Sequence, residues 1–323
     1  MPAHSILTAD IGGTNCRFAL FSCNEALRLE RTAWHKTYDL KDLGDVLATC
    51  EQSLGLSPRE AEVVVLAVAG PVAGSRARTT NADLVLDLEH AGQRHGLHRV
   101  RLINDFEAQA YACLTFPGQN AQQIVSGKRD NKPANARKAV LGAGTGLGAA
   151  SLFRQANGRW IALAAESGHA VFPFVGKEEA AFEAFIRKEL GLPYVRGDDV
   201  LTGRGLSLLH QFLEGVRREP QDVAKAALQG DSPTLRWFSR FYARTCRNWA
   251  LTTLCLDGLY IAGGIAAKNP LLVTDPGFAE AFLTSPAYGD LVRSIPVWLM
   301  TNENSGLWGA ARLGSDILNF PED

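Results

Sequence analysis

Two glycine-rich turns in the sequence have the composition of phosphate-binding loops. The first is Gly12-Gly13-Thr14 and the second is Gly144-Thr145-Gly146. Because glycine lacks a Cβ, its backbone can approach a phosphate closely, and consecutive N–H groups form an anion-binding nest. Each turn also carries a threonine hydroxyl. Together the two turns could hold a polyphosphate from both sides.

A carboxylate precedes only the first of these turns. Asp10 lies two residues before Gly12, and the second turn has no matching acid. A carboxylate beside phosphates repels them unless a cation lies between, so we expect Asp10 to bind Mg²⁺ through water. Since one carboxylate serves two turns, the sequence predicts one nucleotide site rather than two.

The second turn also fits a different nucleotide motif. Residues 144–149 satisfy G-x-G-x-x-A, and Glu166 follows at about the 20-residue distance typical of dinucleotide-binding folds. That motif requires a helix after the glycines. Here the sequence continues as a strand, an Asn157-Gly158 turn and another strand. We therefore reject a dinucleotide-binding fold.

Three further groups of polar residues could carry chemistry. Asn104-Asp105 follows an apolar strand, where α/β folds place ligands, but the residues alone favour Asp105 as a helix cap. Glu166 and His169 lie three apart in a glycine turn and can face one pocket. Asp198 belongs to an acidic pair that is either a solvated loop, a helix cap or part of a site.

The elements that must position these residues alternate between strands and helices. Residues 63–69 and 100–103 are apolar runs typical of buried strands, and residues 40–54 have helical spacing. This alternation favours an α/β fold. A strand, glycine turn and strand occurs at 7–21 and again at 140–153, which predicts two related lobes with a cleft between them. The alternative, that glycine-rich hairpins are common in any α/β protein, stays open.

Other segments are predicted more coarsely. Residues 87–95 are predicted to be helical, and the polar residues 117–137 to form a connector. Helices dominate afterwards, at 177–190, 204–215, 221–228 and 232–254.

Composition excludes several classes of protein. The 323 residues include 33 Lys and Arg and 34 Asp and Glu, so there is no global basic field for nucleic acid or an anionic membrane. No apolar run approaches the roughly 20 residues of a membrane span, and no secretory signal is visible. The six cysteines form no C-x-x-C and no zinc spacing. We expect a cytoplasmic protein with reduced thiols.

Several segments, in this order and spacing, resemble the bacterial glucokinase family. They are TADIGGTNCRFALF, LAVAGPV, LINDFEAQAYA, VLGAGTGLGAASL, ESGHAVF, VLTGRGL, LYIAGGI and NSGLWGAA, and they run nearly end to end. The resemblance implies an α/β, two-lobed actin-like ATPase (ribonuclease H-like) fold with a central cleft. We expect a smaller N-terminal lobe at 1–112, with the C-terminal helix 305–320 packing back on it, and a larger lobe at 113–304.

The resemblance also assigns roles to residues. Asp105 corresponds to the family's general base and to a sugar ligand. The other implied sugar contacts are Asn104, Glu166, His169, Asp198, Thr80 and Asn81. The implied ATP contacts are Ala9, Asp10, Ile11, Gly12, Gly13, Thr14, Gly142, Gly144, Thr145 and Gly146 for the phosphates, and Gly263 and Gly264 beside the adenosine.

The activity that the resemblance implies is ATP- and Mg²⁺-dependent phosphorylation of the 6-hydroxyl of D-glucose. The alternatives are a kinase for another hexose or an amino sugar, and an actin-like ATPase without sugar chemistry. A homodimer would fit the family. One position departs from its pattern, because Asp198 stands where the family usually has Glu. An aspartate is one methylene shorter, so either the loop moves inward or water bridges to the sugar.

Overall fold

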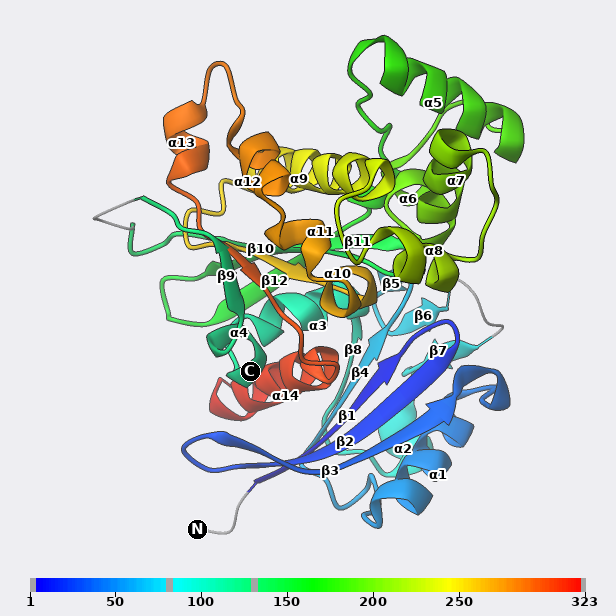
Figure 1. Ribbon diagram of the computed structural model, residues 1–323. Helices are drawn as coiled ribbons and strands as arrows, with labels where there is room; N and C mark the ends of the chain where they lie inside the picture. The colour runs from blue at the N-terminus through cyan, green and yellow to red at the C-terminus, as the bar shows by residue number, and fades with distance from the viewer. Residues whose placement is uncertain (1–3, 80–83, 129–132, 321–323) are drawn as a thin grey trace. The chain divides into compact units, whose positions relative to one another are not determined.

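The protein divides into two compact units. The structure is a computed structural model that describes residues 4–79, 84–128 and 133–320 (Figure 1). Unit 1 comprises Met1–Asn120, Arg154–Ala164 and Asn302–Asp323, and unit 2 comprises Ala121–Phe153 and Ala165–Thr301. The lobe boundaries expected from the sequence stay a prediction.

The main sheet of unit 1 has the strand order β3-β2-β1-β4-β8. The chain pairs β1, β2 and β3 antiparallel as consecutive hairpins, and it adds β4 and β8 parallel to β1. The strands are β1 (His4–Ile11), β2 (Asn15–Cys23), β3 (Leu27–Lys36), β4 (Val63–Val68) and β8 (Val100–Asn104). A smaller sheet contains β5 (Val72–Ala73), β6 (Arg76–Arg78) and β7 (Val85–Asp87).

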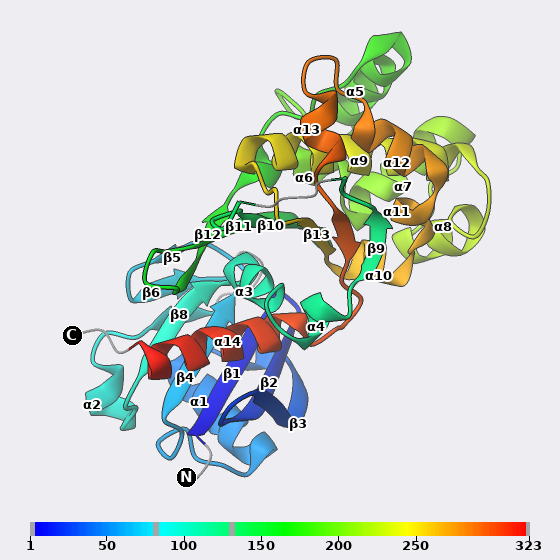
Figure 2. The same ribbon diagram turned by 90° about the vertical axis from the view of Figure 1, so that its left-hand side faces the viewer.

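Helices cover both faces of the main sheet. Alternate residues of β1 face opposite sides, so Leu7 lies in one core with α1 while Ile6 packs against Leu307 and Ala311 of α14. Figures 1 and 2 show α3 and α14 on one face and α1 on the other. The helices of this unit are η1 (Thr37–Asp39), α1 (Leu43–Leu54), α2 (Ala91–His95), α3 (Asp105–Ala112), α4 (Phe116–Gln119) and α14 (Ser305–Asn319).

The parallel strands of unit 1 end at one edge of the sheet. Asp10 on β1 pairs in register with Ala67 on β4, and Val68 pairs with Asn104 on β8. Since the carboxyl ends of parallel strands meet at a common edge, Asp10 and Asn104 lie on the same edge, two strands apart.

Unit 2 repeats this strand pattern. Its strands follow the order β11-β10-β13-β14-β9, in which β10 and β11 form an antiparallel hairpin and β13 and β14 are parallel to β10. The repeat of hairpin and parallel strands agrees with the duplication that the sequence predicts. The strands are β9 (Gln122–Val125), β10 (Lys138–Ala143), β11 (Leu147–Arg154), β13 (Leu259–Ala262) and β14 (Val297–Leu299), and β12 (Trp160–Ala165) follows β11 in the chain.

A long helix organises the core of unit 2. α9 (Pro233–Thr253) buries Phe238, Phe241 and Tyr242, and it packs against α12 and β10 (Figure 2). The other helices are η2 (Ser167–His169), α5 (Gly176–Leu190), α6 (Gly197–Val200), α7 (Gly203–Glu214), α8 (Pro220–Ala227), α10 (Gly264–Lys268), α11 (Leu271–Thr274), α12 (Pro276–Leu283) and α13 (Gly289–Arg293). Within the described ranges, no helix has the length and apolar character of a bilayer span.

Two coarse predictions differ from the structure. The expected connector at 117–137 contains the strand β9, because its residues pair antiparallel with β14. The expected helix at 87–95 is helical only over Ala91–His95, because Val85–Asp87 pairs with β6 instead.

The contact between α14 and α3 yields a test of the fold. A Cβ at Gly309 of α14 would overlap the carbonyl oxygen of Ala108 on α3. We expect Gly309→Ala to lower the free energy of unfolding by about 1–3 kcal/mol, the usual cost of overpacking, and to lower the melting temperature accordingly. Gly230→Ala is the matched control, because a Cβ there would meet no atom within 4 Å. Equal melting temperatures for the two variants would contradict this packing.

Candidate active site

Asp10 lies at the carboxyl end of β1 on the face covered by α14. A Cβ at Gly306, in the first turn of α14, would lie only 2.6 Å from Asp10 Oδ2. Burial raises the pKa of Asp10, and the nearby Arg17 charge lowers it only in part. A cation bound at this carboxylate would offset the cost of burying its charge, so the residue suits Mg²⁺.

A cation at Asp10 would take further ligands from water or from substrate phosphates. Among the described residues, no group of three or more His, Cys, Asp or Glu side chains is arranged to hold a metal ion. Mg²⁺ commonly takes one or two carboxylates and completes its octahedron with water and substrate phosphates. The single carboxylate of Asp10 fits this mode of binding.

The first glycine turn follows Asp10, and hydrogen bonds from Thr37 hold its backbone. The Gly12 N–H donates to the Asn15 carbonyl at 3.0 Å, and the Thr37 hydroxyl donates to the Gly12 carbonyl at 2.7 Å. The Thr37 N–H donates to the Thr14 carbonyl at 3.1 Å. These bonds hold the turn in one conformation, with the Thr14 side chain exposed.

Asn104, and not Asp105, is the cap of α3. The Phe106 N–H donates to Asn104 Oδ1 at 2.8 Å, and Glu107 accepts from the Asn104 N–H at 3.0 Å, which completes a capping box. Asn104 Nδ2 donates to the Gly70 carbonyl at 3.0 Å, which leaves its second Nδ2 hydrogen for a ligand. Asp105 is half-buried at the first helical position. The sequence-based interpretation of Asp105 as the helix cap is therefore wrong, because its neighbour Asn104 is the cap.

The second glycine turn lies in unit 2, between β10 and β11. The Gly144 N–H donates to the Gly146 carbonyl at 2.8 Å, and the Ala143 N–H donates to the buried Tyr242 hydroxyl at 3.3 Å. Gly142 is buried within β10, and a Cβ there would lie 2.7 Å from the Ala262 carbonyl oxygen. Glycine at that position therefore allows the ends of β10 and β13 to approach each other.

The segment after β13 meets the same turn. Gly263 has a φ of +83°, and a Cβ there would lie 2.9 Å from the Ala143 nitrogen. Both the left-handed backbone and the lack of space favour glycine. Gly264 begins α10 directly afterwards. The structure thus brings Gly142, Gly144, Thr145, Gly146, Gly263 and Gly264 to one edge of the unit 2 sheet.

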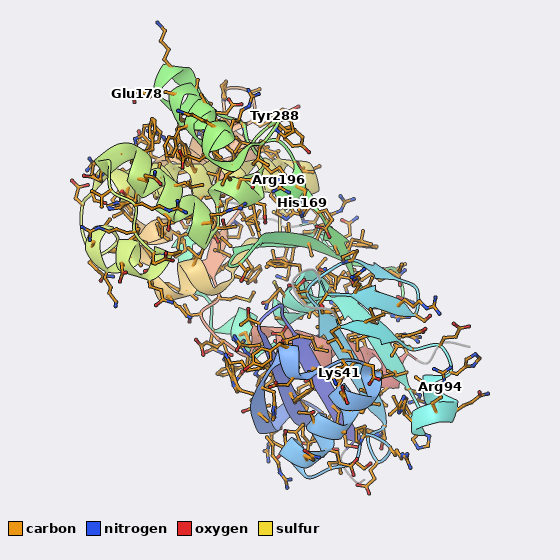
Figure 3. The ribbon with its side chains drawn as sticks, turned by 90° about the vertical axis from the view of Figure 1, so that its right-hand side faces the viewer. Lys41, Arg94, His169, Glu178, Arg196 and Tyr288 are labelled. Atoms are coloured by element: carbon orange, nitrogen blue, oxygen red, sulfur yellow. The ribbon has the colours of Figure 1, made fainter. Side chains whose placement is uncertain are left out.

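Glu166 directly precedes η2 and His169 is its last residue, beside this turn. A Cβ at Gly168 would overlap the Leu147 carbonyl oxygen, so η2 and the second glycine turn are in direct contact. Both side chains are exposed, and His169 Nε2 lies 3.9 Å from Glu166 Oε2. The Arg196 guanidinium contacts His169 at 3.2 Å, and Figure 3 labels both residues.

Asp198 binds the second glycine turn. The Leu147 N–H donates to Asp198 Oδ1 at 2.7 Å, and a Cβ at Gly146 would lie 3.0 Å from the same oxygen. The Asp198 side chain thus reaches the backbone directly after the second glycine turn. Asp198 is half-buried on α6, next to the η2 segment.

Each unit therefore groups part of the predicted site. Unit 1 brings together Ala9, Asp10, Ile11, Gly12, Gly13, Thr14, Asn104 and Asp105, and unit 2 brings together the second glycine turn, Glu166, His169 and Asp198. Thr80 and Asn81 lie outside the described residues. Sequence reasoning missed the supporting residues Thr37, Arg196, Tyr242 and Gly306. Only Gly306 had a signal, in the segment NSGLWGAA.

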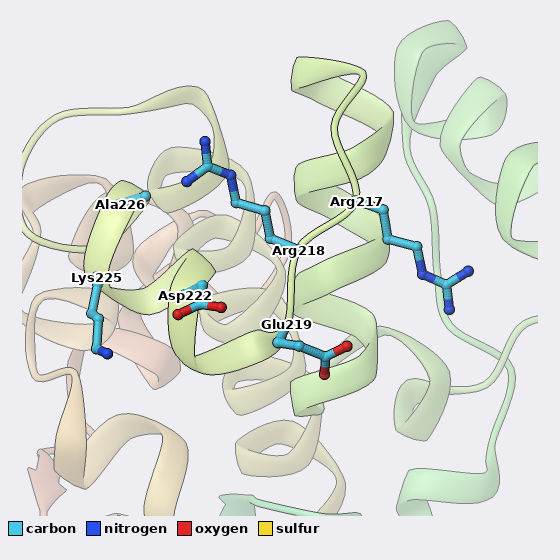
Figure 4. A pocket seen from close by; sticks show the side chains of 6 residues that line it. All are labelled: Arg217, Arg218, Glu219, Asp222, Lys225 and Ala226. Carbon is cyan, nitrogen blue, oxygen red and sulfur yellow. The ribbon is translucent and has the colours of Figure 1, made fainter.

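A separate hollow of about 730 Å³ lies beside α8 (Figure 4). Its lining includes three cations and two acids, and Arg217 and Arg218 point in different directions. The lining residues are Arg217, Arg218, Glu219, Asp222, Lys225 and Ala226. None of the predicted site residues is among them.

Comparison with known proteins decides the family. The sequence profile of the family Glucokinase matches residues 7–316. The chain belongs to the glucokinase family. It is 34% identical over 319 residues to the glucokinase of Pseudomonas aeruginosa strain PAO1, covering 94% of this chain and 92% of that one. It is 32% identical over 326 residues to the glucokinase of Agrobacterium fabrum, covering 98% and 93%.

Solved structures of glucokinases share the fold. A glucokinase from an Antarctic psychrotroph superposes with a TM-score of 0.81 at 28% identity, covering 96% of this chain and 98% of that one. The glucokinase of Balamuthia mandrillaris, solved in complex with glucose, has a TM-score of 0.78 at 20% identity, covering 96% and 93%. A ROK hexokinase from Thermus thermophilus has a TM-score of 0.62 at 19% identity, covering 95% and 97%. The predicted actin-like α/β fold is confirmed, and so is the prediction that the chain is a glucokinase-type enzyme.

The contact between Asp198 and Leu147 can be tested by a pair of substitutions. Asp198→Ala leaves the Leu147 N–H without its acceptor and loosens the turn, whereas Asp198→Asn keeps an acceptor oxygen. We expect the alanine variant to raise the KM for ATP by about two- to tenfold, the effect of one hydrogen bond, and the asparagine variant to raise it less. Asp231→Ala, at an exposed aspartate, is the control. An unchanged KM for ATP in Asp198→Ala would show that the contact does not support nucleotide binding.

Proposed function

We propose that this chain transfers the γ-phosphoryl group of ATP to the 6-hydroxyl of D-glucose, with Asp105 as general base. The family match supports the reaction class, and one observation supports the assignment of the base. Asp105 directly follows β8 at the same sheet edge as Asp10, so the proposed base and the proposed magnesium ligand belong to one edge of unit 1. The carboxyl edge of such a sheet is where α/β folds bind ligands.

The two glycine turns are proposed to hold the phosphates of ATP. Their backbone N–H groups supply positive partial charge without a basic surface, which agrees with the net charge of −1. Mg²⁺ at Asp10 would neutralise part of the phosphate charge. Gly263 and Gly264 are proposed to lie beside the adenosine, since both belong to the edge that carries the second turn.

The sugar is proposed to bind through amide, imidazole and carboxylate groups. Each sugar hydroxyl both donates and accepts, so a site must offer both kinds of partner. Asn104 offers an N–H donor, and Glu166 and Asp198 offer acceptor oxygens. The His169 ring adds nitrogens that can donate or accept. We also propose Thr80 and Asn81 as sugar contacts on the family resemblance alone, and a homodimer on the same ground.

Asp105 is proposed to accept the proton of the 6-hydroxyl as its oxygen attacks phosphorus. An ordinary aspartic acid has a pKa of about 3.9, far below that of an alcohol, so its carboxylate cannot deprotonate the hydroxyl in the ground state. Proton transfer therefore comes late, which suits a loose phosphoryl-transfer transition state. Asp105 also orients the hydroxyl toward phosphorus before any proton moves.

The role of Asp105 is tested by substitution. We expect Asp105→Asn, which keeps the shape of the side chain, to lower kcat by about 10²–10⁴-fold, because general base catalysis is lost. Asp290→Asn is the control, since Asp290 also lies in the first turn of a helix but is exposed. Steady-state kinetics with glucose and ATP provide the measurement. Near-normal turnover in Asp105→Asn would exclude it as the base.

The sugar specificity is tested by ATP turnover with a panel of hexoses. We expect ADP release to depend on glucose and to match glucose 6-phosphate formation mole for mole. Mannose, fructose and N-acetylated amino sugars serve as the competing substrates. Faster turnover with one of these would favour the alternative sugar kinase, and sugar-independent hydrolysis would contradict sugar kinase activity altogether.

A further inference from the structure

A fully buried carboxylate on α6 lies next to η2, the turn that carries the proposed sugar contacts Glu166 and His169. The Asp199 side chain has no exposed surface, and Arg196 binds it through two nitrogens, Nε to Oδ2 at 2.9 Å and Nη2 to Oδ1 at 2.8 Å. Arg204 adds a third contact, from Nη2 to Oδ1 at 3.0 Å. Burial alone would raise the pKa of Asp199, but these bonds outweigh it and keep the pKa below its usual value. Asp199 therefore stays ionised and holds the Arg196 guanidinium in one orientation.

The third nitrogen of the Arg196 guanidinium contacts His169 of η2. Arg196 Nη1 lies 3.2 Å from His169 Nδ1 (Figure 3). A guanidinium carries only donors, so His169 Nδ1 must be the acceptor. A neutral imidazole that accepts at Nδ1 carries its proton on Nε2. The arrangement thus determines which nitrogen of the His169 ring donates a hydrogen bond.

We infer that Arg196 is a positioning residue that holds His169 as the Nε2–H tautomer, so that His169 donates a hydrogen bond to a sugar hydroxyl. This inference rests on the proposed function, because it concerns the sugar bound there. His169 Nε2 lies 3.9 Å from Glu166 Oε2, which places a donor beside an acceptor. Such a pair matches a hydroxyl, which accepts one hydrogen bond and donates another.

The same geometry separates the roles of the two arginines. Arg196 and Arg204 both pair with Asp199, but of these two only Arg196 is recorded in contact with His169. The Arg204 side chain is 57% exposed and Arg196 is 27% exposed. Removing Arg204 therefore tests the effect of losing one partner of Asp199 while the contact with His169 remains.

The first test measures the tautomer in the wild-type protein. Long-range ¹H–¹⁵N correlation spectra of histidine-labelled protein distinguish the Nε2–H from the Nδ1–H form. Seven histidines are present, and the signals lost in His169→Gln identify those of His169. We expect the Nε2–H pattern. An Nδ1–H pattern would overturn the inference, and the measurement requires no substitution at Arg196.

The second test compares Arg196→Gln with Arg204→Gln. We expect Arg196→Gln to populate both tautomers and to raise the KM for glucose by about five- to tenfold, the effect of one hydrogen bond. The kcat and the KM for ATP should change by less than about twofold, because the lost hydrogen bond weakens sugar binding equally in the ground state and the transition state. Arg196→Lys keeps the charge but lacks the planar guanidinium that donates to Asp199 and His169 at once. Its KM for glucose should therefore rise as in Arg196→Gln.

Two results of this comparison would overturn the inference. One is an unchanged tautomer and an unchanged KM for glucose in Arg196→Gln. The other is an equal rise in the KM for glucose in Arg204→Gln, which would point to Asp199 itself. Failure of the proposed function is seen separately, as a wild-type protein that does not phosphorylate glucose while its His169 spectrum can still be recorded.

Discussion

No side chain can stand at position 168, because a Cβ there would overlap the carbonyl oxygen of Leu147. A Cβ at Gly197 would likewise lie 3.0 Å from Leu147 Cδ2 and 3.3 Å from the Gly168 carbonyl oxygen. These two glycines let the second glycine turn, η2 and α6 pack against each other through their backbones. The bonds from Leu147 to Asp198 and from Arg196 to His169 cross the same junction. The groups of unit 2 that are proposed to bind phosphate and sugar are therefore parts of one packed cluster.

The strand–turn–strand pattern could be predicted from the sequence because it depends on local chemistry. Glycines between two apolar runs demand a tight turn, and the structure places both turns between antiparallel strands, β1 with β2 and β10 with β11. The position of Asn104-Asp105 at the end of the apolar run 100–103 is equally local, and in the structure Asn104 is the last residue of β8. The helices at 177–190, 204–215, 221–228 and 232–254 were each predicted to within about two residues, as expected for long periodic segments.

The remaining features depend on partners that are distant in the chain. β9 forms because β14, more than 170 residues later, supplies its hydrogen bonds, and no local pattern marks residues 122–125. The cap of α3 is Asn104, because its amide also reaches the carbonyl of Gly70 on another segment. Arg196 has no sequence motif at all. Its proposed role follows from a buried acid three residues away and a histidine 27 residues earlier.

The course of the chain through unit 1 has a consequence for synthesis. The side of the sheet that carries Ile6 and Phe21 is covered by α14, which follows all of unit 2 in the sequence. A ribosome therefore releases β1 and β2 nearly 300 residues before the helix that shields them. During that interval unit 2 can complete its own core, whereas the first strands keep one apolar face in water. The helix that closes this sheet thus leaves the ribosome only after the strands of unit 2 have been made.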